Sequence, residues 1–209
     1  MCGIVLKEIN KLINERRNFM IYIIRHGQTD WNIEHRTQGH TDIALNINGI
    51  KLAELMAQKI ANLKIDNIIS SDLKRAYMTA QIINKKFNKN IETDKRLREF
   101  SFGTLEGITR EKITPEIWDD FNKNPKKFNA EKREEIFKRI KSFINDIKSN
   151  DKNILVVTHG GPIRMIKYYL ENGESFNDKK YLAEYMTLKI NNLDLFIIDE
   201  EMNLIKNNL

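Results

Sequence analysis

The chain has 209 residues, of which 41% are hydrophobic and 31% are charged. This composition is typical of a globular protein with one domain or two small ones. No apolar run reaches the roughly 18 residues that a membrane-spanning helix requires, and the N-terminal apolar run is too short for a signal peptide. The single cysteine, Cys2, excludes an internal disulfide and a zinc site built on several cysteines. We therefore expect a cytoplasmic protein that does not bind membranes.

The formal net charge is +6, which favours anionic partners such as phosphorylated metabolites or nucleic acids. Basic residues nevertheless alternate with acidic residues along the expected helices, as they do in residues 131–135. Such alternation is typical of a solvated helix face, and the chain contains no zinc finger, aromatic RNA-binding motif or long basic run. We expect no nucleic-acid partner.

Residues 1–19 have the pattern of an N-terminal extension. Apolar residues recur there at helical spacing, which predicts an amphipathic helix. The first apolar strand begins at Met20, and we hypothesise that this Met is the native start and that the segment before it is a mis-assigned start; the intact mass of the native protein tests this. The chain has three prolines, no linker-like segment and no repeat, so we expect a single domain over residues 20–209.

From Met20 onward, apolar strand patterns alternate with amphipathic helix patterns. The spacing predicts strands at residues 20–24, 67–70 and 153–158, and helices at residues 47–63, 73–87 and 131–148. Pro162 is suited to the first turn of a further helix. Residues 185–190 and 194–199 alternate in polarity across Asn191-Asn192, which predicts a hairpin or a pair of edge strands. The fold class is therefore α/β, with a mostly parallel central sheet and helices on both faces.

Polar and glycine residues follow three of the expected strands. The three segments are Arg25-His26-Gly27, Ser70-Ser71-Asp72 with Arg75 in the next helix, and His159-Gly160-Gly161. Ligands of open α/β sheets bind at the carboxyl ends of the strands, so we expect these groups to meet at one edge, close to helix N-termini. Arginine matches phosphoryl oxygens in a bidentate manner, and glycine permits close approach of the backbone. This edge is a candidate phosphate site.

His26 and His159 are the candidate reactive groups, whereas His35 and His40 are expected to be structural. Neighbouring arginines disfavour protonation of an imidazole, which frees a ring nitrogen to attack phosphorus. The leaving oxygen then requires a proton, which a nearby carboxylic acid can supply. A catalytic metal is the alternative, but the chain has no His-Glu-x-x-His motif and two arginines would repel a divalent cation. We expect no metal and no other cofactor.

Five motifs carry this chemistry: residues 25–32, 36–49, 70–80, 97–107 and 158–164. In this order they resemble the histidine phosphatase superfamily, in its phosphoglycerate-mutase-like branch, from Met20 to about Leu170. The resemblance implies a three-layer sandwich and a phosphohistidine intermediate.

The resemblance also implies a role for individual residues. His26 would be the nucleophile, and Glu99 would protonate the leaving oxygen and later activate water. The phosphoryl group would be bound by Arg25, Arg75 and His159. Substrate contacts are implied for Gly27, Thr29, Asn32, Gln38, Gly39 and Gly160. Glu106 is the competing carboxylate, and we expect it to be a structural residue of its loop.

The resemblance covers both phosphatases and mutases. Only 23 residues separate Gly107 from Glu131, whereas the cofactor-dependent mutases carry a long basic insertion there. The mutases also tend to have Ser and Asn at the positions of Thr29 and Gly161. We therefore expect a phosphomonoesterase acting on a small phosphorylated metabolite, with a cofactor-dependent phosphoglycerate mutase as the alternative. A non-catalytic ligand-binding module would lack His26, Glu99 or His159.

Residues 104–130 are the expected lid that selects the substrate. They combine aromatic side chains with Lys123, Lys126 and Lys127. The lysines would either meet a second anionic group or keep the lid solvated. Many relatives carry Gly-Glu-Ser just before the long helix, where this chain has residues 128–131, so substrate contacts on that side are expected to differ.

Overall fold

The computed structural model describes residues 19–148, 151–199 and 201–207. The predicted N-terminal helix and the question of the native start therefore concern residues outside the described part of the chain, apart from the buried Phe19. Within the described ranges, no helix combines the length and the apolar character needed to cross a membrane.

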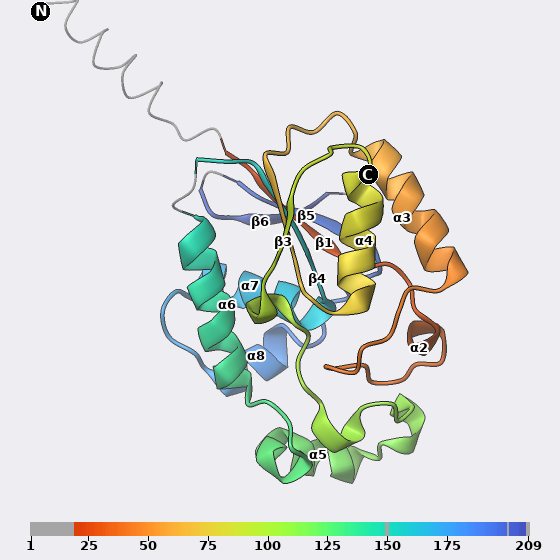
Figure 1. Cartoon of the computed structure of the whole chain (residues 1–209). Coiled ribbons are helices and arrows are strands. Elements are labelled where there is room, and N and C mark those ends of the chain that lie inside the picture. Colours follow the sequence, from red (N-terminus) through yellow and green to blue (C-terminus); the bar gives the residue numbers. More distant parts are fainter. Residues whose placement is uncertain (1–18, 149–150, 200, 208–209) are drawn as a thin grey trace, which may run out of the picture.

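The described strands form one mixed sheet in the order β3–β2–β4–β1–β5–β6 (Figure 1). Neighbours from β3 to β1 are parallel, whereas β5 is antiparallel to both β1 and β6. The strands are β1 (Ile21–Arg25), β2 (Asn67–Ser70), β3 (Ile91–Thr93), β4 (Ile154–Thr158), β5 (Leu195–Ile198) and β6 (Leu204–Asn207). The helices are α2 (Asp30–Ile33), α3 (Ile47–Lys59), α4 (Lys74–Asn84), α5 (Pro115–Lys123), α6 (Arg133–Ile147), α7 (Gly160–Asn172) and α8 (Asp178–Glu184).

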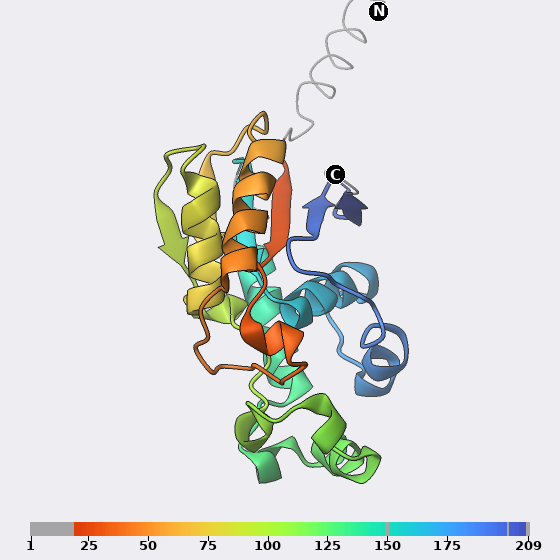
Figure 2. The same cartoon turned by 90° about the vertical axis from the view of Figure 1, so that its right-hand side faces the viewer.

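Each face of the sheet buries its own apolar cluster. Because successive side chains of a strand point to opposite faces, Ile21 and Ile23 of β1 pack with α6 and α7, while Tyr22 and Ile24 pack with α3 and α4. The two views place α3 and α4 together on one face (Figures 1 and 2). A strand that is covered on both sides must be apolar throughout, which explains why β1 and β4 read as continuous apolar runs. The predicted α/β sandwich is confirmed.

Most predicted elements are present with slightly different ends. The predicted strand at residues 67–70 is β2, and the predicted helices at 47–63, 73–87 and 131–148 are α3, α4 and α6, each shorter than expected. Pro162 lies in the first turn of α7, as predicted.

The pairing predicted across Asn191-Asn192, as a hairpin or a pair of edge strands, is wrong, although the predicted strand at residues 194–199 is present as β5. Residues 185–190 form no strand, and β5 lies between β1 and β6 in the sheet. The carbonyl oxygen of Leu188 accepts a hydrogen bond from Arg164 Nε at 2.8 Å, and that of Ile190 accepts one from Arg25 Nη1. Arginine side chains thus occupy backbone carbonyls that were expected to accept hydrogen bonds from a neighbouring strand.

The segment expected to be the lid forms a small layer of its own. Between β3 and α6 the chain forms α5 and several short 3₁₀ turns. α5 and the later turns pack on a separate apolar cluster made of Leu105, Ile113, Phe121 and Ala130, whereas Leu97 of the first turn belongs to the core cluster of α6 and α7. Both views show α5 beyond one end of the sheet, away from the two helical layers (Figures 1 and 2).

Candidate active site

His26 follows β1 directly and is 2% exposed. Its Nδ1 lies 2.7 Å from the carbonyl oxygen of Gly27. A carbonyl can only accept, so Nδ1 carries the proton and donates it, and Nε2 keeps the free lone pair. Burial, reinforced by the charges of Arg75 and Arg25, holds the pKa of His26 well below its ordinary value of 6.5. The imidazole is therefore neutral and nucleophilic at neutral pH.

Asn192 holds the loop that carries this nucleophile. Its Nδ2 donates to the carbonyl oxygens of His26 and Gly27, at 2.9 and 3.1 Å, and to Asn32 Oδ1 at 3.2 Å. The backbone nitrogen and hydroxyl of Thr29 also donate to Asn32 Oδ1, at 3.0 and 3.1 Å. Because donors surround this oxygen, the amide nitrogen of Asn32 is the end left for the adjacent cavity. The local sequence pattern gives Asn192 no catalytic role, because it predicts only a connection between two strands at this position.

A second anchor of the same loop comes from α4. The backbone nitrogen of Gly27 donates to Thr79 Oγ1 at 2.9 Å, and that hydroxyl donates to the carbonyl oxygen of Arg75 at 2.7 Å. Thr79 and Arg75 are both fully buried. This chain of hydrogen bonds links the nucleophile loop to the helix that carries a predicted phosphate ligand.

Arg75 is oriented by the loop that contains Gly39. Its Nη1 donates to the carbonyl oxygen of Thr41 at 3.0 Å, and its Nη2 donates to that of Gly39 at 2.7 Å. Burial lowers the pKa of Arg75 to about 10, so the guanidinium stays charged at neutral pH. Gly39 has a φ of +56°, and a Cβ there would collide with the Glu106 carboxylate, which explains why this position requires glycine.

Buried donors without partners converge beside His26. Within the described residues, the Nε atoms of Arg25 and Arg75 and Nδ1 of His159 have no hydrogen-bond partner. The ring of His159 lies 5.1 Å from that of His26 between centroids, and its Nε2 contacts the Ser71 hydroxyl at 2.9 Å. Unpaired buried donors are costly. A phosphoryl group is an anion that can accept from the Nε–H groups of both arginines, and from His159 Nδ1 in the tautomer in which Ser71 donates to Nε2, so the residues fit the predicted ligand.

Glu99 lies in the loop that precedes the lid, and its carboxylate faces the same group of residues around His26. Its Oε1 accepts from the backbone nitrogens of Phe100 and Gly161, at 2.9 and 3.1 Å. Gly161 lies in the first turn of α7, where unpaired N–H groups favour an acidic side chain. A Cβ at Gly161 would overlap the Glu99 carboxylate, so this glycine leaves room for it.

Glu106 has a different environment. Its Oε1 accepts from the backbone nitrogens of His40 and Phe102, both at 3.0 Å, and its Oε2 accepts from the backbone nitrogen of Thr41 at 2.8 Å and its hydroxyl at 2.6 Å. It does not line the cavity described next. These bonds join two loops and support the expectation that Glu106 is structural.

A cavity of about 600 Å³ opens in front of these groups. The predicted site residues that line it are Arg25, His26, Asn32, Gln38, Gly39, Arg75 and Glu99. His159 is fully buried beside His26 and does not line the cavity. The lining also excludes Gly27, Thr29 and Gly160; the first two support the nucleophile loop, and substrate contact by any of the three stays a prediction.

The rest of the cavity lining combines aromatic residues with further arginines. Trp118 and Phe121 of the lid line it, together with Arg110, Arg133 and Arg164. The lid lysines do not; Lys123, Lys126 and Lys127 pair instead with Asp119, Glu135 and Asp120. The cationic side chains of the described chain that line the cavity are therefore all arginines, and three of them, Arg110, Arg133 and Arg164, were not among the predicted site residues.

Only some of these arginines are already neutralised. Arg133 donates to Asp178 and to Asn122. The Arg164 side chain donates only through Nε, to a backbone carbonyl, and the Arg110 side chain has no hydrogen-bond or ion-pair partner among the described residues. The charges of Arg164 and Arg110 both help burial to lower the pKa of Arg25, while Glu99 opposes them. The cavity thus carries positive charge in addition to that of Arg25 and Arg75, and this charge is not neutralised by the described residues.

Within the described part of the chain, no group of three or more His, Cys, Asp or Glu residues is arranged to hold a metal ion.

The similarity of this chain to a known protein family extends beyond the site residues. Residues 21–194 match the sequence model of the histidine phosphatase superfamily, branch 1. The chain belongs to this superfamily. The match confirms the resemblance and, together with phosphatase relatives, the prediction that this protein is a histidine phosphatase enzyme.

Relatives of this histidine phosphatase include proteins with different names. It is 38% identical over 157 residues to phosphoglycerate mutase-like protein 4 of Arabidopsis thaliana, covering 70% of this chain and 68% of that protein. It is 35% identical over 153 residues to putative phosphoserine phosphatase 2 of Hydrogenobacter thermophilus, covering 70% of this chain and 75% of that protein.

Solved structures share the fold over nearly the whole chain. Phosphoserine phosphatase from Entamoeba histolytica, in complex with 3-phosphoglyceric acid, is similar with a TM-score of 0.74 and 27% identity, covering 91% of this chain and 95% of that chain. A mycobacterial glucosyl-3-phosphoglycerate phosphatase is similar in fold with a TM-score of 0.76 and 23% identity, covering 91% of this chain and 98% of that chain.

Proposed function

We propose that this histidine phosphatase hydrolyses a small phosphomonoester through a phosphohistidine intermediate on His26. The observation that carries the proposal is the state of the His26 ring. Its Nδ1 donates to the Gly27 carbonyl, its Nε2 is free, and its low pKa keeps the imidazole neutral. Arg25, Arg75 and Glu99 line the same cavity.

The first half-reaction transfers the phosphoryl group to the protein. Nε2 of His26 attacks phosphorus, and the new P–N bond forms as the bond between phosphorus and the leaving oxygen breaks. Arg25 and Arg75 stabilise the charge on the three equatorial oxygens. Glu99, in its protonated form, gives its proton to the leaving oxygen, so an alcohol departs and Glu99 is left ionised.

The second half-reaction restores the enzyme. A water molecule attacks phosphorus while the Glu99 carboxylate takes one of its protons. The P–N bond breaks, its electron pair returns to Nε2 of His26, and inorganic phosphate is released. Glu99 is protonated again, so the balance closes with one water consumed and no metal or cofactor required.

The charge of the cavity supports a substrate with a second acidic group. Of the lining residues in the described chain, five are arginines and one, Glu99, is a carboxylate. One of the five, Arg133, is already paired with Asp178. Because Arg25 and Arg75 are assigned to the phosphoryl group, Arg110 and Arg164 are left for a carboxylate or a second phosphate. The names of the relatives, which include phosphoserine and glucosyl-3-phosphoglycerate phosphatases, are consistent with this substrate class.

The short segment between Gly107 and Glu131 favours hydrolysis over mutase activity. It forms α5 and short turns but lacks a long basic insertion. A mutase must protect its phosphohistidine from water, whereas this cavity of about 600 Å³ has room for water beside a small substrate. Phosphoglycerate mutase activity remains the second candidate, since some relatives carry that name.

The test is phosphate release from a panel of phosphomonoesters by the wild type and by His26→Ala. The panel includes p-nitrophenyl phosphate, phosphoserine and 3-phosphoglycerate, the last also with 2,3-bisphosphoglycerate. Release and a ³²P-labelled protein should both vanish in His26→Ala. Near-normal release by the variant contradicts the proposal, as does strong inhibition by a chelator. Interconversion of phosphoglycerates without release would establish the mutase instead.

A further inference from the structure

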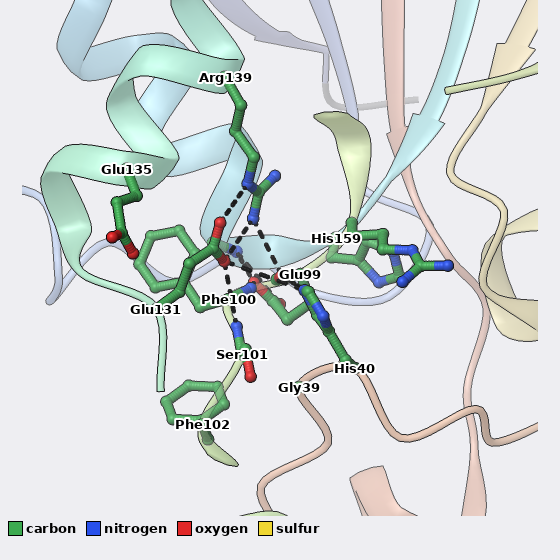
Figure 3. Close-up of polar contacts among 12 residues, drawn as sticks. Gly39, His40, Glu99, Phe100, Ser101, Phe102, Glu131, Glu135, Arg139 and His159 are labelled. Atoms are coloured by element: carbon green, nitrogen blue, oxygen red, sulfur yellow. Dashed lines mark hydrogen bonds and ion pairs between the residues drawn. The ribbon is translucent and has the colours of Figure 1, made fainter. Parts of the chain in front are cut away.

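The loop that carries Glu99 is held by an ion pair on α6. Arg139 of α6 and Glu131, just before this helix, have side chains that are only 15% and 18% exposed. Arg139 Nε donates to Glu131 Oε1 at 2.8 Å and its Nη2 donates to Glu131 Oε2 at 3.1 Å. This bidentate geometry fixes the plane of the guanidinium (Figure 3).

The same guanidinium reaches the backbone on the acid loop. Arg139 Nη2 also donates to the carbonyl oxygen of Glu99 at 3.0 Å, and Nη1 donates to that of Arg96. Glu131 in turn accepts from the backbone nitrogen of Ser101 at 3.3 Å. Arg139 and Glu131 together therefore hold the backbone on both sides of the Glu99 side chain, and neither residue lines the cavity.

His40 extends the contact to the phosphate-binding end of the site. Its Nε2 lies 2.9 Å from the same Glu99 carbonyl oxygen, and since a carbonyl only accepts, Nε2 donates. His40 lies between Gly39 and Thr41, whose carbonyl oxygens accept from the guanidinium of Arg75. The carbonyl of Glu99 is thus where the acid loop meets the loop that orients Arg75.

We propose that Arg139, fixed by Glu131, is a positioning residue for proton transfer by Glu99. This inference rests on the proposed function. Arg139 does not touch substrate; it holds the loop so that the Glu99 carboxyl stays beside the backbone nitrogen of Gly161 and within the cavity. Its contribution therefore falls on the step in which the leaving oxygen receives a proton, and not on binding of the phosphoryl group.

Proton transfer by Glu99 is sensitive to the position of the loop that carries it. A proton donor acts at hydrogen-bond distance, and a misplacement of about 1 Å can cost on the order of 100-fold in rate. A guanidinium that spans two backbone carbonyls and a carboxylate cannot be replaced by the single ammonium of lysine without losing some of these bonds. Loosening the pair frees the loop while His26, Arg25 and Arg75 keep their own anchors.

The experiment uses Arg139→Lys and Glu131→Gln in the full chain, with Glu135→Gln as the matched control. Glu131→Gln keeps the size of the side chain but replaces an accepting oxygen by an amide donor. Glu135 lies on the same helix, and its carboxylate contacts Lys126 and the backbone nitrogen of Lys132 instead of the acid loop. Each protein is assayed with p-nitrophenyl phosphate, whose leaving group needs no proton, and with glycerol 3-phosphate, whose leaving group does.

The expected result is a split between the two esters. For Arg139→Lys and Glu131→Gln, kcat on glycerol 3-phosphate should fall about 10- to 100-fold, part of what a general acid contributes. On p-nitrophenyl phosphate, kcat/KM should stay within about 3-fold of the wild type, and Glu135→Gln should match the wild type on both. A further variant, Arg139→Ala, removes the guanidinium entirely, and a guanidinium salt added in solution should partly restore its activity on glycerol 3-phosphate.

Equal losses on both esters, or no loss on either, would overturn the positioning role. A general loss of folding shows as equal losses with a lowered melting temperature, so the ester ratio distinguishes it. Failure of the proposed function is also distinct, because it appears as activity of His26→Ala on p-nitrophenyl phosphate, which the Arg139 result does not affect.

Discussion

The amide nitrogen of Asn192 lies 2.9 Å from the carbonyl oxygen of His26, although 166 residues separate them in the sequence. It donates to three oxygens in total, two in the loop that follows β1 and one, Asn32 Oδ1, in the short helix α2 after it. The loop before β5 thus fixes the backbone around the nucleophile and leaves its imidazole to the cavity. Since a neighbouring residue, Ile190, holds Arg25 by its carbonyl oxygen, the same segment supports two members of the site.

Asn192→Asp tests this support. The change keeps the shape of the side chain but places a carboxylate among three oxygen acceptors, which repel it. We expect kcat for p-nitrophenyl phosphate to fall about 100-fold, the loss expected when a reacting group moves by roughly 1 Å. Asn191→Asp is the control, because Asn191 is exposed. Steady-state kinetics on both variants measures the difference, and equal activities would show that Asn192 does not position the nucleophile.

Gly161→Ala tests the space reserved for Glu99. The added Cβ would overlap the Glu99 carboxylate and lie 2.9 Å from a ring carbon of Phe100, so the acid must move. Activity on glycerol 3-phosphate should fall by at least about 10-fold more than activity on p-nitrophenyl phosphate, because only the first ester requires a proton on its leaving group.

Gly160→Ala is the comparison for that variant. A Cβ at Gly160 would lie 3.3 Å from the flexible end of Arg164 and away from Glu99. It should therefore alter the two esters by similar factors. A stronger leaving-group preference in Gly160→Ala than in Gly161→Ala would contradict the assignment of Glu99 as the proton donor.

The sequence predicts the reacting groups better than it predicts what holds them. His26, Arg75 and His159 follow apolar strands or begin helices, and parallel strands bring their carboxyl ends to one edge, so local pattern is sufficient to place them. Asn192 and Arg139 act through contacts between distant segments. Arg139 reads as one more charged residue of an amphipathic helix, and only the packing of α6 against the acid loop distinguishes it from its exposed neighbours.

Contacts between distant segments also explain why the predictions for the C-terminal segment and the lid differ from the structure. Alternating polarity at residues 185–190 predicts a strand, but Arg25 and Arg164 occupy backbone carbonyls of this segment, and such long-range competition leaves no trace in local spacing. In the lid, Lys123 and Lys127 were candidate anion ligands. Nearby acidic residues pair with them, and the cavity is lined instead by Arg110 of the lid, Arg133 of α6 and Arg164 of α7, beside the predicted Arg25 and Arg75.

The buried histidines predict how stability depends on pH. Burial and nearby arginines hold the pKa of both His26 and His159 well below 6.5, whereas in the unfolded chain each returns to about 6.5. Below this pH the unfolded state therefore binds protons that the folded state does not. The free energy of unfolding should fall as pH decreases below about 6.5, with each histidine contributing up to about 1.4 kcal/mol per pH unit, and these two contributions should be constant above it.

His159→Asn isolates one of these contributions. Urea denaturation of the wild type and the variant at pH 7.5, 6.5 and 5.5 gives the two slopes. The variant should be less stable at pH 7.5 if the contact with Ser71 contributes, but it should lose less stability on acidification than the wild type. A parallel pH dependence of the two proteins would show that His159 does not stay neutral in the fold.

The position of Arg110 at the cavity predicts that the substrate carries a second acidic group. Its side chain is exposed at the cavity and has no hydrogen-bond or ion-pair partner among the described residues, so its replacement leaves no buried group unsatisfied. 3-Phosphoglycerate and glycerol 3-phosphate differ only in carrying a carboxylate or a hydroxymethyl group at the far end. If Arg110 binds this second acidic group, Arg110→Met should lower kcat/KM for 3-phosphoglycerate by about 10-fold, the size of one charged hydrogen bond.

Glycerol 3-phosphate provides the internal standard, and its kcat/KM should change by less than about 2-fold, since it places no charge near Arg110. Lys112→Met removes a positive charge two residues away, at a position that does not line the cavity, and should leave the ratio of the two esters unchanged. A ratio that responds equally to both variants would mean that general electrostatic attraction sets the preference. A ratio that responds only to Arg110→Met would assign the carboxylate to this arginine, because a screened long-range field does not distinguish two cations so close in the chain.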